Sequence, residues 1–198
     1  MKDANPPATQ PLGSEAAIAP EYDVAIVGFG PVGAFAANLL GQMGINVLVV
    51  ERHPTVFTLP RAIVLDDEAM RMMRRIGLLD DIAPFTTPVR TVAFVAPDGS
   101  RLQGYDVPDE VEKPHGFFPN YFFHQPSVEA VLRQGARRFP SINVRTGEKV
   151  VGLSQRPTYA RLLIRDATGV LSSIRARYIM ACDGARSTIR TSLGIRSR

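Results

Sequence analysis

Three glycines and one acid have the residue types and the spacing to bind a dinucleotide. The segment GFGPVG places Gly28, Gly30 and Gly33 in the pattern G-x-G-x-x-G, and Glu51 follows 23 positions after the first glycine. In such a turn the first glycine permits a tight bend, the second lets the backbone approach a pyrophosphate, and the third allows close helix–strand packing. An acid near this position accepts hydrogen bonds from the ribose hydroxyls of adenosine and disfavours a 2′-phosphate. The four residues therefore predict a site for FAD or NAD rather than NADP.

The segments around this motif are those that a βαβ unit requires. Residues 23–28 and 45–51 are short β-branched runs, and residues 31–43 predict a helix with one apolar face, made of Val32, Phe35, Leu39 and Met43. The N-terminus of that helix would supply unpaired N–H groups and partial positive charge. The uncharged run 24–50 is long enough to suggest a membrane span, but its five glycines and Pro31 divide it into three pieces. We therefore expect no membrane span, and a glycine-rich turn that binds nothing is the less favoured alternative.

The rest of the chain alternates predicted helices and strands. Acids at 66–68 and arginines toward residue 75 favour one helix, and Pro126 opens another that ends before Pro140. Two β-rich runs, 89–95 and 101–107, flank a turn cluster and predict a hairpin outside the parallel sheet. Further strands are predicted at 142–145, 149–154, 160–166, 170–177 and 178–182.

Composition and charge exclude several other classes of protein. The 198 residues are 45% hydrophobic and 21% charged, as is typical of globular chains. A net charge of +4 suits a polyanionic ligand but is too small to indicate a nucleic-acid surface. The single cysteine excludes an internal disulfide and favours a reducing, cytoplasmic location. The three histidines lack metal-ligand spacing, so no metal is expected, and residues 1–21 are expected to be a disordered lead-in.

A second motif lies near the end of the chain, where residues 182–190 read CDGARSTIR. Asp183-Gly184 alone would indicate only a turn. The segments that together carry a resemblance are 28–33, 51–52, 60–62, Gln125 and 182–190. They resemble the group A flavoprotein aromatic hydroxylases, whose second signature is D-G-x-x-S-x-x-R, with its fixed positions filled here by Asp183, Gly184, Ser187 and Arg190. Within that family, further stretches most resemble the 3-(3-hydroxyphenyl)propionate hydroxylases.

The resemblance implies an α/β fold: a Rossmann-like three-layer FAD-binding domain over residues 22–198, incomplete, with a small antiparallel substrate-side element at about 88–120. It implies FAD as cofactor and NADH or NADPH as co-substrate. In this family NAD(P)H reduces the flavin, and O2 then supplies the oxygen that enters a phenol ring. The flavin carries the chemistry, so no catalytic side chain is assigned. The expected substrate is a phenolic aromatic acid such as 3-(3-hydroxyphenyl)propionate.

The same resemblance implies a role for each candidate residue. The pyrophosphate would lie on Gly28, Gly30 and Gly33, the ribose on Glu51 and the adenine side on Arg52, with Arg61 and Gln125 near the pyrophosphate and ribityl chain. Asp183, followed by Gly184, would contact the cofactor linker and order its loop, while Arg190 would anchor that loop and could meet the nicotinamide nucleotide. Without the resemblance, Arg52 and Arg61 would be interpreted as ordinary solvated arginines.

The sequence departs from the family in one respect. A third signature, a Gly-Asp motif in a later strand–helix turn, has no match before the sequence stops at Arg198. We therefore expect a fragment, a truncated reading frame or half of a split enzyme, with exposed apolar strand edges and a complementary C-terminal chain or a homo-oligomer as partner. Two other functions stay open: a non-catalytic FAD-binding remnant or partner-dependent subunit, and a related flavin reductase or halogenase.

Overall fold

The structure, a computed structural model, describes residues 19–196. Residues 1–18 of the predicted lead-in lie outside the described residues. The described chain begins with strand β1 (Tyr22–Val27), helix α1 (Pro31–Gln42) and strand β2 (Val47–Glu51), and helix α4 (Gln125–Ala136) later leads into strand β8 (Ile142–Thr146). The βαβ unit predicted around the glycine motif is confirmed.

Parallel and antiparallel strand pairs are combined in one six-stranded sheet. Its order is β8-β2-β1-β11-β10-β9, in which β9 (Lys149–Gln155), β10 (Ala160–Arg165) and β11 (Leu171–Ala181) form an antiparallel meander. Because β11 runs parallel to β1, the strands β2, β1 and β11 all end at the same edge of the sheet. Open α/β sheets bind their ligands at this edge.

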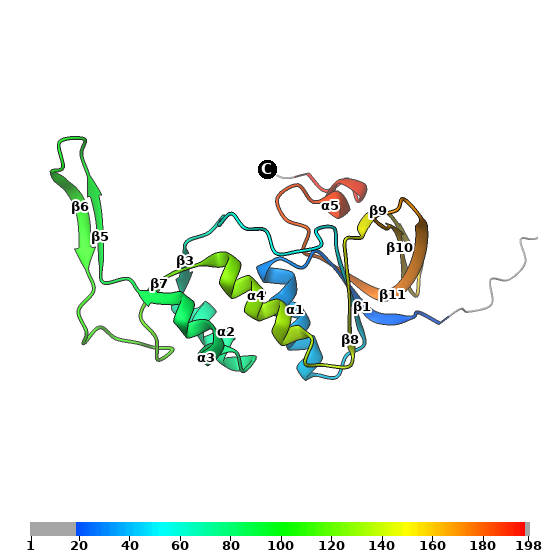
Figure 1. Cartoon of the computed structure of the whole chain (residues 1–198), viewed down its shortest axis with the longest axis horizontal. Coiled ribbons are helices and arrows are strands. Elements are labelled where there is room, and N and C mark those ends of the chain that lie inside the picture. The colour runs from blue at the N-terminus through cyan, green and yellow to red at the C-terminus, as the bar shows by residue number, and fades with distance from the viewer. Residues whose placement is uncertain (1–18, 197–198) are drawn as a thin grey trace, which may run out of the picture.

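Alternating residues of β1 face two separate cores. Val24 and Ile26 pack with α1, α4 and helix α2 (Asp67–Arg75) on one face of the sheet. Ala25 and Val27 pack on the other face, against the meander and helix α5 (Thr188–Ser192). Strands buried on both faces read as continuous apolar runs, which explains the uncharged segment seen in the sequence. Helices, parallel strands and meander thus make three layers (Figure 1), and the predicted Rossmann-like three-layer fold is confirmed.

Helix α1 fully buries its small residues, and the apolar face predicted for it is wrong at Val32 and Met43. Val32 and Met43 are 71% and 66% exposed, and Phe35 and Leu39 are only partly buried. The buried residues are Gly33, Ala34, Ala36, Ala37, Asn38 and Gly41. The reason is close packing: α1 lies between the sheet and α4, and a Cβ on Gly41 would overlap the Phe139 ring. Only small side chains fit such an approach.

Two small antiparallel sheets extend from the helical side of the molecule (Figure 1). One contains the short strands β3 (Val64–Asp66), β7 (Asn120–Phe123) and β4 (Thr86–Pro88), with helix α3 (Leu79–Ile82) and a 3-10 turn before β4. The other is a hairpin of β5 (Thr91–Val95) and β6 (Arg101–Asp106) that projects from the body. The hairpin predicted at this place is confirmed, and its assignment to a substrate side stays a prediction. Sequence periodicity missed β3, β4 and β7 because three or four residues are too few to show it.

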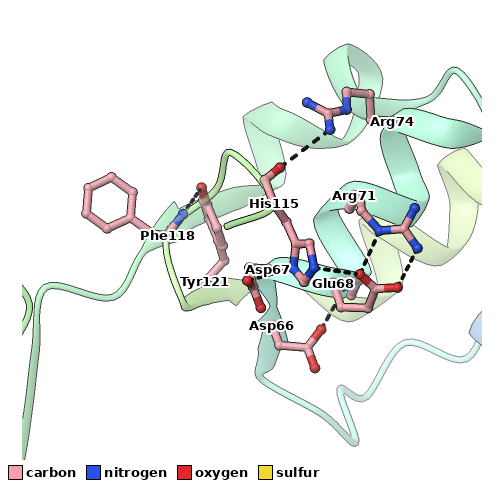
Figure 2. Close-up of polar contacts among 9 residues, drawn as sticks. Asp66, Asp67, Glu68, Arg71, Arg74, His115, Phe118 and Tyr121 are labelled. Carbon is pink, nitrogen blue, oxygen red and sulfur yellow. Dashed lines mark hydrogen bonds and ion pairs between the residues drawn. The ribbon is translucent and has the colours of Figure 1, made fainter. Parts of the chain in front are cut away.

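The acids at the start of α2 are all held by neighbouring groups (Figure 2). Asp66 caps the helix by accepting a hydrogen bond from the Ala69 N–H at 2.7 Å. Glu68 pairs with Arg71, whose Nε lies 2.6 Å from its Oε2, and Asp67 Oδ2 lies 2.8 Å from His115 Nδ1. Capping and ion pairs account for the cluster, as its position at a helix start predicts.

Strand β11 is continuous where the sequence predicts two strands. Ala176 pairs with Ala160 of β10 on one side and with Tyr22 of β1 on the other. Beyond it, residues 177–181 pair only with β1 among the described strands. Tyr178 is 67% exposed and Met180 is 38% exposed. This half of β11 is therefore an apolar strand edge open to solvent.

Candidate functional site

A cleft of about 510 Å³ opens where β1, β2 and β11 end. Its walls are the glycine turn after β1, the end of β2 with the following loop, one side of α4, the start of β9 and the turn after β11. Eight of the ten residues predicted for the site line it: Gly28, Gly30, Glu51, Arg52, Arg61, Gln125, Asp183 and Gly184. The other two, Gly33 and Arg190, support the walls from behind.

The two sequence motifs touch each other at the base of the cleft. Gly28 has φ +99°, and a Cβ on it would overlap the backbone carbonyl of Cys182. A Cβ on Gly33 would overlap the Gly28 carbonyl oxygen, so this glycine lets α1 pack on the turn. Gly30 differs from both, because a Cβ there would have no atom within 4 Å. The second glycine therefore borders open space in the cleft.

Glu51 braces the glycine turn from the end of β2. Its side chain is buried, and its Oε2 accepts a hydrogen bond from the Phe29 N–H at 2.7 Å. Its Oε1 accepts one from the His53 N–H at 2.8 Å. A carboxylate has about four lone-pair positions, so roughly two remain for the hydroxyls of a ligand. The acid thus positions two loops while it faces the cleft.

Asp183 presents one carboxylate oxygen with no protein partner. Its Oδ2 accepts hydrogen bonds from the N–H groups of Thr188 and Ile189 at 2.7 and 3.2 Å, which orders the turn before α5. Its Oδ1 is buried and accepts no hydrogen bond within the described residues. A buried acceptor without a donor is costly, which indicates a ligand donor at this point. Arg190 closes the same turn by donating to the Ala185 carbonyl at 2.8 Å.

Gln125 fastens the loop that carries Arg61. Its buried Oε1 accepts hydrogen bonds from the backbone N–H groups of Arg61 and Ala62 at 2.6 and 2.8 Å. The side-chain amide N–H groups are left to donate elsewhere. The Arg61 guanidinium lies 5.4 Å from the centre of the Phe57 ring, and Arg52 Nε lies 3.1 Å from His53 Nε2. Both arginines line the cleft from exposed positions in the loop that follows β2.

Sequence reasoning missed several charged residues that also line the cleft, and two of them lie on one helix. Glu129 and Arg133 lie on α4, four and eight positions after Gln125, on the same helical face. Their spacing of four predicts only a helical ion pair, but the spacing from Gln125 is a signal that all three residues share a face. Arg133 donates from Nη2 to Glu129 Oε1 at 2.7 Å and from Nε to the Phe29 carbonyl at 2.8 Å. Burial raises the pKa of Glu129 above its ordinary value, against the opposing effect of the Arg133 charge.

Other candidate groups bear on what the cleft can do. Cys182 lines it, and burial raises the pKa of this thiol, with the Asp183 charge adding to the rise, so it is a poor nucleophile. Residues 19–196 contain no cluster of three or more His, Cys, Asp or Glu side chains that could hold a metal ion. No helix in the same range is long and apolar enough to cross a membrane.

The residues present fit an adenine dinucleotide. Gly30 leaves open space beside the N-terminus of α1, which has no side-chain cap and no acid in its first turn. Such a helix end attracts phosphate through its free N–H groups. Glu51 and the unpartnered Asp183 Oδ1 supply acceptors for ligand hydroxyls on two sides of the cleft.

Comparisons with known proteins agree with this geometry. A family model described as an FAD binding domain matches residues 21–198. The 3-(3-hydroxy-phenyl)propionate/3-hydroxycinnamic acid hydroxylase of Klebsiella pneumoniae subsp. pneumoniae is 41% identical over 172 residues, which are 87% of this chain and 30% of that protein. The chain therefore spans about 30% of the length of the curated relatives it matches.

Solved structures of flavin monooxygenases are also similar to this chain. The p-nitrophenol 4-monooxygenase of Pseudomonas putida DLL-E4 superposes with a TM-score of 0.78 and 30% identity, covering 87% of this chain and 43% of that one. The flavin-dependent monooxygenase PieE, solved in complex with FAD and substrate, gives a TM-score of 0.79 and 27% identity, covering 89% of this chain and 33% of that one.

Proposed function

This chain belongs to the FAD binding domain family, and from that premise we propose that it is the FAD-binding portion of an NAD(P)H-dependent monooxygenase that hydroxylates a phenolic aromatic acid. The observation that carries the proposal is the meeting of the two motifs at one cleft. The glycine turn packs on the backbone of the Asp183 turn, and both border the same space. A dinucleotide that runs from one motif to the other would meet phosphate-binding N–H groups and then a hydroxyl acceptor.

Different residues of the cleft would contact different parts of the cofactor. The N-terminus of α1 and Gly30 would receive the pyrophosphate, and Glu51 would accept from the adenosine ribose. Arg52 would lie on the adenine side, and Arg61, held in place by Gln125, would balance phosphate charge. Asp183 Oδ1 would accept from a hydroxyl of the ribityl linker. Arg190 would act at a distance, by keeping the Asp183 turn closed.

A bound flavin would supply the redox chemistry, with NADH or NADPH as reductant and O2 as the source of the inserted oxygen. The protein's part would be to hold the flavin in one place and keep water from it. A phenolic acid such as 3-(3-hydroxyphenyl)propionate is proposed as substrate because the 41% identical relative is named for that compound.

Titration of the purified chain with FAD tests the binding step. We expect a saturable change in flavin absorbance and fluorescence, with one site per chain. The catalytic step is tested separately, with the chain alone and with a polypeptide that covers the relative's remaining length, by NADH or NADPH oxidation on addition of 3-(3-hydroxyphenyl)propionate, with the hydroxylated product measured directly. FAD binding with NAD(P)H oxidation but no hydroxylated product would favour a flavin reductase, and a brominated or chlorinated product with added halide would favour a halogenase. Failure to bind FAD would refute the proposal.

The whole activity is proposed to need a complementary chain or a second copy of this one. The open edge of β11 at residues 177–181 and the exposed side chains Phe94, Val95, Leu102 and Tyr105 of the β5–β6 hairpin support this. Unpaired strand edges and isolated two-stranded hairpins are stabilised by further strands. This observation also favours the partner-dependent subunit as a second candidate function. Light scattering of the chain with and without a polypeptide that covers the relative's remaining length would distinguish a complex from a self-associating or a monomeric chain.

A cytoplasmic location is proposed as well, because the chain has one cysteine and the proposed reaction consumes NADH or NADPH. Cell fractionation with detection of this chain tests it. Recovery outside the cytoplasmic fraction would contradict it.

A further inference from the structure

Helix α4 holds the glycine turn by one peptide group. We propose that Arg133, locked by Glu129, is a positioning residue that sets the orientation of the Phe29–Gly30 peptide and so prepares the turn for a pyrophosphate. This inference rests on the proposed function, since it concerns the same cleft. Arg133 and Glu129 have no part in either sequence motif.

Both backbone groups of Phe29 are held by buried or nearly buried side chains. Its N–H donates to Glu51 Oε2 at 2.7 Å, and its carbonyl accepts from Arg133 Nε at 2.8 Å. The Arg133 guanidinium also lies 5.2 Å from the centre of the Phe29 ring, which is itself fully buried. Hydrogen bonds to charged partners are stronger than those between neutral groups. The residue before Gly30 is therefore fixed on both sides.

The direction of the Gly30 N–H follows from this arrangement. A trans peptide is planar, with its C=O and N–H pointing in opposite directions. Because the Phe29 carbonyl points at Arg133 on α4, the Gly30 N–H points away from α4. A Cβ on Gly30 would meet no atom within 4 Å, so the backbone at this residue borders open space. If the peptide rotated, the carbonyl oxygen would enter that space and repel a phosphate.

Glu129 keeps Arg133 in this position. The Glu129 side chain is 2% exposed and that of Arg133 is 12% exposed, and Arg133 Nη2 lies 2.7 Å from Glu129 Oε1. A buried carboxylate leaves a neighbouring guanidinium few other arrangements, because breaking the pair would leave a charge without a partner. The pair thus fixes the guanidinium so that its Nε can reach the glycine turn.

A single peptide can be followed by NMR, because Phe29–Gly30 is the sole Phe–Gly step in the sequence. Labelling the full chain with carbonyl-13C phenylalanine and 15N glycine gives one correlation peak, which reports the Phe29 carbonyl and the Gly30 amide together. ADP is the probe, since it carries the pyrophosphate without the flavin. In the unmodified chain we expect this peak to move as ADP is added.

The variants are Arg133→Met and Arg133→Lys, with Arg137→Met as the matched control, an exposed arginine one turn further along the chain and outside the cleft. In Arg133→Met we expect the Phe29 carbonyl signal to shift before any ligand is added, and the dissociation constants of ADP and FAD to rise by the same factor, roughly tenfold or more for a lost charged hydrogen bond. Arg133→Lys, which keeps the charge and can still pair with Glu129, should fold and show an intermediate loss. Arg137→Met should match the unmodified chain.

Each outcome decides the proposal. Unchanged ADP and FAD affinity in both Arg133 variants, or an unmoved carbonyl signal, would overturn the positioning role while the proposed function stands. If Arg133→Met fails to fold, Arg133→Lys decides in the same way. If the unmodified chain binds neither ADP nor FAD, the proposed function itself is refuted.

Discussion

Gly33 lies directly behind Gly28, so close that a Cβ on Gly33 would overlap the carbonyl oxygen of Gly28. Gly30, between them in sequence, has free space where its side chain would be. Gly28 and Gly33 therefore have no room for a side chain because protein atoms lie next to them. At Gly30 a side chain would extend into the space that a ligand of the cleft would occupy.

Substitution at Gly30 should separate binding from folding. Its φ of −69° and ψ of −174° are accessible to any residue, and a Cβ meets nothing. Gly30→Val should therefore keep the melting temperature of the ligand-free chain and abolish FAD binding, as measured by flavin fluorescence. Gly33→Ala is the contrasting variant, expected to lower the free energy of unfolding by about 1–3 kcal/mol through overpacking. A Gly30→Val chain that binds FAD normally would contradict the assignment of the pyrophosphate.

Removal of the Glu51 carboxylate should weaken the binding of FAD. Glu51→Ala removes the proposed ribose acceptor and also leaves the Phe29 N–H without its partner. We expect FAD binding to weaken by about 1–3 kcal/mol, together with a lower melting temperature of the ligand-free chain. Glu68→Ala, which removes a half-exposed carboxylate at the start of α2, serves as the control and should leave the FAD dissociation constant unchanged. Equal FAD affinity in the two variants would show that Glu51 does not bind the cofactor.

The effects of the two Asp183 oxygens on chain stability and on FAD binding should be separable by substitution. Asp183→Asn keeps one carbonyl oxygen for the N–H groups of Thr188 and Ile189, so the turn should stay ordered. It replaces a charged acceptor by a neutral group, which should raise the dissociation constant of FAD roughly tenfold. Asp183→Ala should in addition destabilise the ligand-free chain by about 1 kcal/mol through the lost hydrogen bonds from the N–H groups of Thr188 and Ile189. Equilibrium titration and thermal unfolding of both variants measure these effects. Full affinity in Asp183→Asn would show that Oδ1 receives no ligand donor.

Stability should depend on pH through Glu129. Burial raises the pKa of this carboxyl in the folded chain above its ordinary value, so the folded state binds its proton more tightly than the unfolded state. The stability that this provides is fully present below the unfolded pKa and is lost as pH rises through the folded pKa. We therefore expect the melting temperature of the ligand-free chain to fall relative to that of Glu129→Gln as pH rises above the ordinary glutamate pKa of about 4.3. A difference that stays constant over this range would show that Glu129 does not titrate with a raised pKa.

The parts predicted from sequence are those specified by local chemistry. The glycine turn, the strands beside it, the α2 start and the hairpin turn all depend on residue types close together in the chain. The buried face of α1 was predicted wrongly because periodicity favours large apolar residues, whereas this helix packs so tightly that Ala37 and Gly41 occupy the interface.

The candidate site was predictable as a set of residues but not as a set of contacts. Glu51 could be placed at a strand end, yet nothing local shows that it accepts from the Phe29 N–H as well. The link from Arg133 to the Phe29 carbonyl joins positions 104 residues apart, and depends on how α4 packs beside α1. Contacts of this range follow from the packing of the whole domain.

Strand β11 is one continuous strand that begins in the meander and ends one residue before Cys182 and the turn of Asp183. A displacement of the outer end, near Leu171, would act on a continuous stretch of backbone whose inner end leads into Asp183, the proposed acceptor for the cofactor linker. Binding of another polypeptide along residues 177–181 of that strand would therefore act on the backbone next to Asp183. We expect the dissociation constant of FAD to change when the chain assembles with a partner, so FAD affinity would also report assembly.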